Sequence, residues 1–349
     1  MIKLKNTRNY SFDFFRVIFT LIICFHHFQG IFNENIIKSG YIGVEFFFIL
    51  SGFLLYKHLK ANTEDTAKEY TIKKLKKLYP EYIFAFIVCF LLQLATNKDN
   101  SILDFLFKPF SEILLIQNIG IFKGNINYPL WYLSVLIIGG FIIYECIKKD
   151  EKLFTRIIFP IIIVFNFSLL NSLGNGLENW ETINGIYMPL LRGIADICIG
   201  VLLSSFMEDN DMDSIYKKID KYYILEYIIE LISCILLGYL VIFKTNYEMY
   251  SIILIAIIIF ACNYKNSLIN KLFNSEIYYK FGRITYSMYV NHASIIIIMS
   301  FLYRKIFKYN ISEINITLIY FALLIIYSII SKHIIKTILE KKKIKSKTL

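Results

Sequence analysis

Apolar residues in this chain gather in long runs that shorter polar stretches separate. A helix rises about 1.5 Å per residue, so about 20 mostly apolar residues are needed to cross the hydrocarbon core of a bilayer. Ten runs approach that length and predict spans at residues 12–29, 40–56, 79–95, 130–147, 156–171, 186–206, 222–243, 249–264, 284–303 and 314–335. An eleventh run, 113–121, is too short to span and suggests a re-entrant or interfacial segment. The pattern predicts an all-α fold: a polytopic membrane bundle of about ten helices, forming one domain over residues 1–349.

The basic residues orient this bundle. Most of the 38 Lys and Arg residues fall on one side of the predicted topology, in residues 1–11, 57–78, 148–156, 207–221, 265–283 and 332–349. Cytoplasmic loops of membrane proteins carry such an excess, which places both termini in the cytoplasm. The basic tail from about residue 336 is typical of an anchor beside anionic lipid.

Composition narrows the class of protein further. Charged residues make up 19% of the chain and hydrophobic residues 56%, whereas a soluble domain carries about 25% charged residues. The net charge is +11, and the charged residues lie between apolar runs. This placement favours membrane topology over nucleic-acid binding. The six cysteines lie in apolar runs without zinc spacing, so neither a metal site nor a disulfide framework is expected. Heavy use of Ile, Lys, Asn and Tyr suggests an AT-rich bacterial genome, and hence a bacterial cytoplasmic membrane.

Ionisable residues inside a span are costly, and the first span contains Asp13, Arg16, His26 and His27. At about 100° per residue, Arg16 and His27 lie within about 20° of one another, and Asp13 is at pairing distance from Arg16. His26 points away and is expected to bond to an outer loop. The rise from Arg16 to His27 is about 16 Å, so they cannot touch, but one extended substrate could contact both. His27 is therefore the candidate general base.

Other spans hold isolated polar groups. Glu45 lies near the outer end of the second span, where solvation competes with a site role. Arg192 and Asp196 are four residues apart, which fits either a self-neutralised pair or a substrate site. Trp131 fits an interfacial aromatic belt or a surface that stacks on a sugar. His292 need not share a face with Arg283 to Thr285, and it is interpreted as structural, with a position lining the site as the alternative.

Five segments occur in an order that resembles a known family. They are Asp13–Arg16 with His27-Phe28, Gly40–Phe53, Leu130–Ser134, Arg192-Gly193 leading to Gly200, and Gly282–His292. Together they resemble the acyltransferase-3 membrane proteins, which include surface-polysaccharide O-acetyltransferases. Leu136 stands where members with an attached hydrolase-like domain often have Glu, which is similar to the stand-alone subtype.

The resemblance implies transfer of an acyl group, commonly acetyl from cytoplasmic acetyl-CoA, to a sugar hydroxyl at the outer face. It implies that His27 is the base and that Arg16 is essential, and Asp13 would then fix Arg16. The expected partners are acyl-CoA, a glycan acceptor and membrane lipids.

The remaining site assignments are as follows. Glu45, Trp131 and Arg192 are candidate substrate-binding residues. Lys74 and Lys77 stand where the family often has Arg-x-x-Arg, and they are candidates for binding the CoA phosphates. Lysine keeps the charge but lacks the bidentate fork of arginine, and membrane topology explains these lysines almost as well.

Two other classes remain open. A transporter or flippase of an acyl group or glycan precursor would use the intramembrane charges to line a path, although no inverted repeat is visible. A scaffold without catalysis would leave the Asp13, Arg16 and His27 stripe unexplained. The acceptor, the acyl group, the choice between direct transfer and an acyl-histidine, and the oligomeric state stay open.

Overall fold

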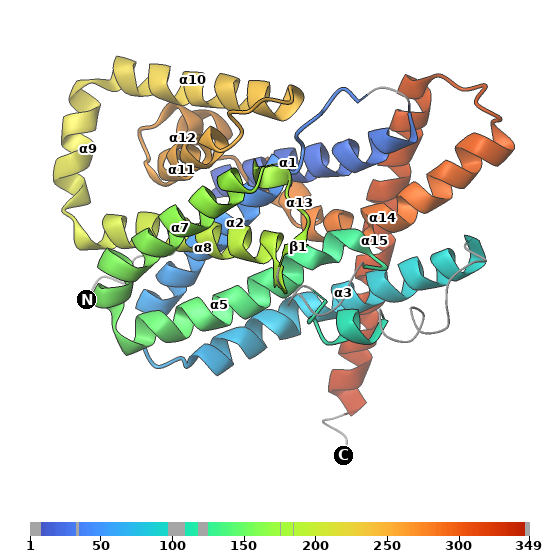
Figure 1. Ribbon diagram of the computed structural model, residues 1–349, viewed down its shortest axis with the longest axis horizontal. Helices are drawn as coiled ribbons and strands as arrows, with labels where there is room; N and C mark the ends of the chain where they lie inside the picture. Colours follow the sequence, from blue (N-terminus) through green and yellow to red (C-terminus); the bar gives the residue numbers. More distant parts are fainter. Residues whose placement is uncertain are drawn as a thin grey trace.

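The computed structural model describes residues 8–32, 35–96, 109–117, 125–174, 176–183 and 185–345, which fold almost entirely into helices (Figure 1). The long helices are α1 (Tyr10–Phe28), α2 (Ile42–Ala61), α3 (Ala67–Thr96), α5 (Trp131–Lys149), α7 (Phe159–Ser172), α8 (Met188–Asp209), α10 (Tyr223–Ile242), α14 (Thr285–Phe301) and α15 (Glu313–Lys345). Within these described ranges, nine helical segments are long and apolar enough to cross a membrane. The predicted fold class, a polytopic helical membrane bundle, is confirmed.

Shorter elements connect the long helices. They are α6 (Glu151–Leu153), α9 (Met212–Lys221), α11 (Tyr250–Asn263), α12 (Leu268–Phe273), α13 (Glu276–Gly282), the turns η1 (Gln29–Ile31), η2 (Tyr128–Leu130), η3 (Phe154–Ile158), η4 (Gly176–Glu178) and η5 (Leu302–Ile306), and the antiparallel pair β1 (Thr182–Ile183) and β2 (Ile186–Tyr187). The predicted span 249–264 is α11, whose 14 residues make it shorter than the other spans. Part of the predicted short run 113–121 lies outside the described residues.

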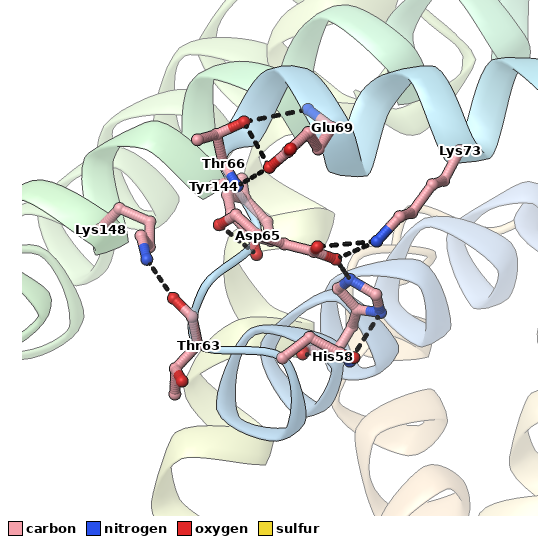
Figure 2. A network of polar contacts seen from close by, with 9 residues as sticks. His58, Thr63, Asp65, Thr66, Glu69, Lys73, Tyr144 and Lys148 are labelled. Atoms are coloured by element: carbon pink, nitrogen blue, oxygen red, sulfur yellow. Dashed lines mark hydrogen bonds and ion pairs between the residues drawn. The ribbon is translucent and has the colours of Figure 1, made fainter.

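Helix α3 begins at Ala67, twelve residues before the predicted start of the third span, at 79. The cause is a capping box: Thr66 Oγ1 accepts a hydrogen bond from the Glu69 backbone N–H, and Glu69 accepts one from the Thr66 backbone N–H at 2.9 Å (Figure 2). The basic stretch after α2, predicted as a loop, is therefore largely helical. Lys74 and Lys77 lie on a helix that points them in fixed directions.

Helices α2 and α8 cross in the interior of the bundle with their backbones in close approach. A Cβ atom at Gly52 would overlap the carbonyl of Ile197, and one at Gly200 would overlap the carbonyl of Ile49. Small residues allow membrane helices to pack in this way. Gly52 and Gly200 are therefore packing residues, and the tight crossing fixes where α2 presents its polar side chains.

The periphery of the bundle is apolar. In Figure 1, α10 runs along one edge of the molecule and reaches α8 through α9. Its side chains Ile224, Leu231 and Ile235 are all exposed, as expected for a lipid-facing helix. Glu230 of the same helix is buried and accepts a hydrogen bond from the backbone N–H of Ile269 at 2.8 Å. That bond caps the start of α12.

Candidate active site

A cavity of about 760 Å³ lies among α1, α2, α3, α5, α13 and α14. Its lining includes Asp13, Arg16 and Thr20 of α1, Ser51 and His58 of α2, Tyr132 of α5, and Tyr286 and Tyr289 of α14. Lys74 and Lys77 of α3 also line it. The structure therefore brings the first half of the predicted polar stripe and the predicted basic residues into one cavity.

The cavity wall is strongly basic. Seven of the lining side chains are cationic: Arg8, Arg16, Lys73, Lys74, Lys77, Arg283 and Lys332. The two carboxylates among the lining residues are Asp13 and Glu81. Such an excess of one charge in a walled cleft concentrates ligands of the opposite charge, so the cavity is suited to a polyanion.

Asp13 is the organising carboxylate of this wall. Its oxygens accept hydrogen bonds from Arg8 Nε at 2.8 Å, Arg8 Nη2 at 2.9 Å and Arg16 Nη1 at 2.9 Å. Asp13 is buried, while the Arg16 side chain is 26% exposed toward the cavity it lines. The backbone of Gly282 comes so close that a Cβ atom there would lie 3.0 Å from the Asp13 Cβ. The predicted Asp13–Arg16 pair is confirmed, and Arg8, which precedes the helix, joins it.

A second network borders the cavity at the link between α2 and α3 (Figure 2). His58 Nε2 lies 2.9 Å and Lys73 Nζ 2.7 Å from Asp65 Oδ2. Hydrogen bonds from Lys73 and then from His58 hold the pKa of Asp65 below its ordinary value. His58 is paired and not simply solvated, because the short link between α2 and α3 brings Asp65 to its ring. Lys74 lies beside Tyr70, with its Nζ 3.2 Å from the hydroxyl.

His27 lies beyond the cavity and does not line it. Its ring centroid is 5.3 Å from that of His292 and 4.9 Å from that of Tyr128. Tyr289 connects the two regions, since it lines the cavity and its ring centroid lies 5.8 Å from that of His292. Arg16 and His27 therefore have different surroundings: Arg16 lines the cavity, and His27 contacts aromatic rings beyond it. His26 bonds to a loop as predicted, with Nδ1 2.9 Å from the Ile37 carbonyl.

Sequence reasoning did not predict the neighbour of His292. Its side chain is fully buried and stacks on His27. The spacing of residues along a helix shows which of them share a face, but it gives no information about which face of α14 meets α1. The signal that was available was the histidine itself, in a span with few ionisable groups.

Glu45, Trp131 and Arg192 come together in a separate, sealed cluster. Arg192 Nε lies 3.2 Å from Glu45 Oε1, and the guanidinium carbon lies 5.1 Å from the ring centroid of Trp131. Trp180, which the sequence did not indicate, covers the guanidinium at 4.8 Å, and Arg192 Nη1 donates to the carbonyl of Leu177. None of the three predicted residues lines the cavity.

Two interpretations are corrected here. Arg192 forms its ion pair with Glu45 rather than with Asp196 on its own helix. Helical side chains lean toward the helix N-terminus, so an arginine near the start of α8 reaches the preceding loop and not the next turn. Trp131 is 5% exposed and belongs to this interior cluster, not to an aromatic belt.

Comparison with known proteins agrees with this arrangement. Residues 9–333 match the model of a family described as an acyltransferase domain. Proteins of Staphylococcus aureus strains COL, MSSA476 and MRSA252, provisionally named as O-acetyltransferases, are each 26% identical over 312 residues. The match covers 81% of this chain and 50% of each relative, so the chain spans about half the length of these relatives. No solved structure matches the chain. Because the family match covers nearly all of the described helices and both polar regions of the bundle, the chain belongs to the acyltransferase-3 family of multi-pass membrane proteins.

Proposed function

We propose that this chain is a membrane O-acyltransferase that moves an acyl group, acetyl in the first instance, from cytoplasmic acyl-CoA to a hydroxyl of a cell-surface or lipid-linked glycan. The observation that carries the proposal is the cavity lined by seven cationic side chains, with a histidine pair beyond it. Acyl transfer is the family's reaction, and the relatives' names support acetyl and a hydroxyl acceptor. Residues 1–349 act as one membrane domain in this proposal.

The donor enters from the basic end of the cavity. Coenzyme A carries several phosphate charges, and Lys74 and Lys77 offer cations to them where α3 borders the cavity. The lining cations come from segments whose charge predicts a cytoplasmic position, such as Arg8, Lys77 and Lys332. This supports entry from the cytoplasm of a bacterial cell, with both termini on that side.

Arg16 lies further along the cavity, and its position is held by Asp13. In the proposed complex its guanidinium binds the donor along the cavity and orients the thioester toward His27. Asp13 is occupied on both oxygens by Arg8 and Arg16, so its role is to position Arg16 and not to take a proton.

His27 takes the proton from the acceptor hydroxyl. The hydroxyl oxygen then attacks the thioester carbonyl carbon, the carbon–sulfur bond breaks, and the proton passes to the departing sulfur. The Glu45–Arg192 cluster supports the acceptor side by fixing α2, α5 and α8 together, and Trp180, 40% exposed, offers an aromatic surface to a sugar ring. Direct transfer in one step is the simplest scheme for these residues.

The experiment uses bacterial membranes that contain the protein and acetyl-CoA labelled in the acetyl group. We expect base-labile label in the glycan fraction for the unaltered protein, and its loss in His27→Asn. His26→Asn is the matched control, because the neighbouring histidine bonds to a loop and asparagine retains that bond. Equal transfer by both variants would remove His27 from the mechanism. Absence of transfer by the folded, unaltered protein with native glycans and several acyl donors would favour a transporter instead.

A further inference from the structure

His292 is a fully buried ionisable group to which the proposed mechanism gives no role. Its side chain is fully buried in α14, and its Nε2 atom has no hydrogen-bond partner among the described residues. A buried polar atom without a partner costs free energy, so such an atom in a native protein needs an explanation. The ring beside it is His27.

One hydrogen bond fixes the tautomer of His292. Its Nδ1 atom lies 2.6 Å from the backbone carbonyl oxygen of Tyr289. A carbonyl oxygen can only accept, so Nδ1 must carry the proton of a neutral imidazole. Nε2 is then an unprotonated nitrogen with a free lone pair, and it can serve as an acceptor.

The ring of His27 can supply the donor that Nε2 of His292 lacks. No hydrogen bond joins its ring to another residue in the part of the chain that the structure describes; its contacts there are with the rings of His26, Tyr128 and His292. The planes of His27 and His292 differ by 17° and their centroids are 5.3 Å apart. Two imidazoles joined by an N–H···N bond of about 2.9 Å have centroids about 5 Å apart. The separation of the two rings therefore allows such a bond when the His27 ring turns an N–H toward Nε2 of His292.

We propose that His292 is the positioning residue for His27: its Nε2 accepts a hydrogen bond from one ring nitrogen of His27, which leaves the other nitrogen unprotonated and ready for the acceptor hydroxyl. This rests on the proposed function, in which His27 is the base. The arrangement follows the general pattern in which a catalytic base is held by a third group. Catalytic hydrogen bonds are often loose before substrate binds and tighten in the complex.

The proton balance of the step is simple. The O–H bond of the acceptor breaks and an N–H bond forms on His27, while the new C–O bond forms and the C–S bond breaks. The proton then passes from His27 to the sulfur of the departing CoA. His292 keeps its own proton throughout, and its lone pair stabilises the His27 imidazolium that exists during the step.

The test compares two substitutions that remove different parts of the imidazole. His292→Asn retains a donor for the Tyr289 carbonyl and loses the acceptor at the Nε2 position. His292→Gln retains an acceptor near the Nε2 position and loses the bond to Tyr289. Rates of labelled acetyl transfer are measured in membranes, and the dissociation constant for acetyl-CoA is measured separately on purified protein.

We expect His292→Asn to lower kcat by about 100-fold, the lower range for removal of acid–base assistance, with unchanged acetyl-CoA affinity. His292→Gln should regain about tenfold over His292→Asn, because it restores the acceptor. A structural role predicts the opposite order, since asparagine alone preserves the bond to the Tyr289 carbonyl.

Thermal unfolding in detergent shows whether each variant is folded. If His292→Asn does not fold, His292→Gln is compared with His292→Leu, which lacks an acceptor, and equal rates for those two overturn the proposal. Near-normal transfer by folded His292→Asn, together with loss in His27→Asn, overturns the positioning role alone. No transfer by the unaltered protein overturns the proposed function, and the positioning role with it.

Discussion

The bundle contains two arginine–carboxylate sites that look alike in sequence and differ in structure. Around Asp13, Arg8 and Arg16 share one buried carboxylate, and the Arg16 side chain remains 26% exposed in a basic cavity. Around Glu45, Arg192 is 1% exposed and is covered by two indole rings. An ionisable residue in a membrane span therefore indicates a special site, but its access to a cavity decides whether it can contact a ligand.

The largest expected effect is on the sealed site. Arg192→Leu leaves the buried carboxylate of Glu45 without its cation, so we expect a loss of about 3–5 kcal/mol in the free energy of unfolding. The measurement is thermal or denaturant unfolding in detergent. Glu45→Gln is the control, and it should cost less, because Asp196 is near enough to compensate Arg192. If Arg192→Leu unfolds at the same temperature as the unaltered protein, the cluster is not structural.

Substitutions at the site around Asp13, which opens into the cavity, should change activity rather than stability. Arg16→Ala is expected to lower kcat by about 100-fold, or about 2.7 kcal/mol, because the thioester is no longer oriented toward His27. Its melting temperature should change much less than that of Arg192→Leu, since water in the cavity can solvate the remaining groups. Thr20→Val, in the same cavity wall, is the uncharged control. A loss of stability as large as that of Arg192→Leu would erase the distinction between the two sites.

The basic end of the cavity should determine donor affinity. We expect the double substitution Lys74→Gln, Lys77→Gln to raise KM for acetyl-CoA about tenfold, or about 1.4 kcal/mol, with kcat little changed. The unaltered protein should also lose affinity with added salt, because exposed charges are screened. Lys217→Gln, Lys218→Gln removes the same charge from α9, away from the lining, and should leave KM unchanged. Equal effects of the two double variants would indicate a general surface effect.

The smallest effect concerns the link network in Figure 2. The pKa of Asp65 is lowered by Lys73 and His58, so the ionised carboxylate adds stability above its unfolded-state pKa, and this stability is lost as pH falls through the lower folded-state pKa. Asp65→Asn should therefore melt slightly below the unaltered protein at about pH 7, and the difference should shrink toward about pH 3. Melting curves across this range test it. Glu64→Gln is the neighbouring control, and a difference that grows at low pH would contradict the pairing.

The sequence predicted features that depend on a single helix. The apolar runs located the spans, and three-residue spacing gave the Asp13–Arg16 pair, because both follow from the geometry of one α-helix. The capping box at Thr66 was visible in the residues and was overlooked because the hydropathy pattern dominated. Arg8 was counted only toward topology, since it precedes the first helix.

Contacts between helices could not be predicted in the same way. The stacking of His292 on His27 depends on how α14 is rotated against α1, and the partner of Arg192 depends on the crossing of α2 and α8. Interior carbonyls, glycines and aromatic rings distributed over the chain set these rotations. Because these residues are far apart in the sequence, no short-range sequence pattern reveals the rotations.

Tyr289 has a further consequence for a cell that maintains ion gradients. Its ring faces the cavity, its hydroxyl donates to the Pro129 carbonyl at 2.7 Å, and its backbone carbonyl holds His292. In the proposed reaction the two substrates arrive from opposite sides of a bilayer, and such an enzyme must not become a leak. The Tyr289 ring lies between the cavity and His292, with Tyr132 in edge contact at 5.7 Å. Permeability, as much as catalysis, is therefore a constraint on the aromatic residues between the cavity and the histidines.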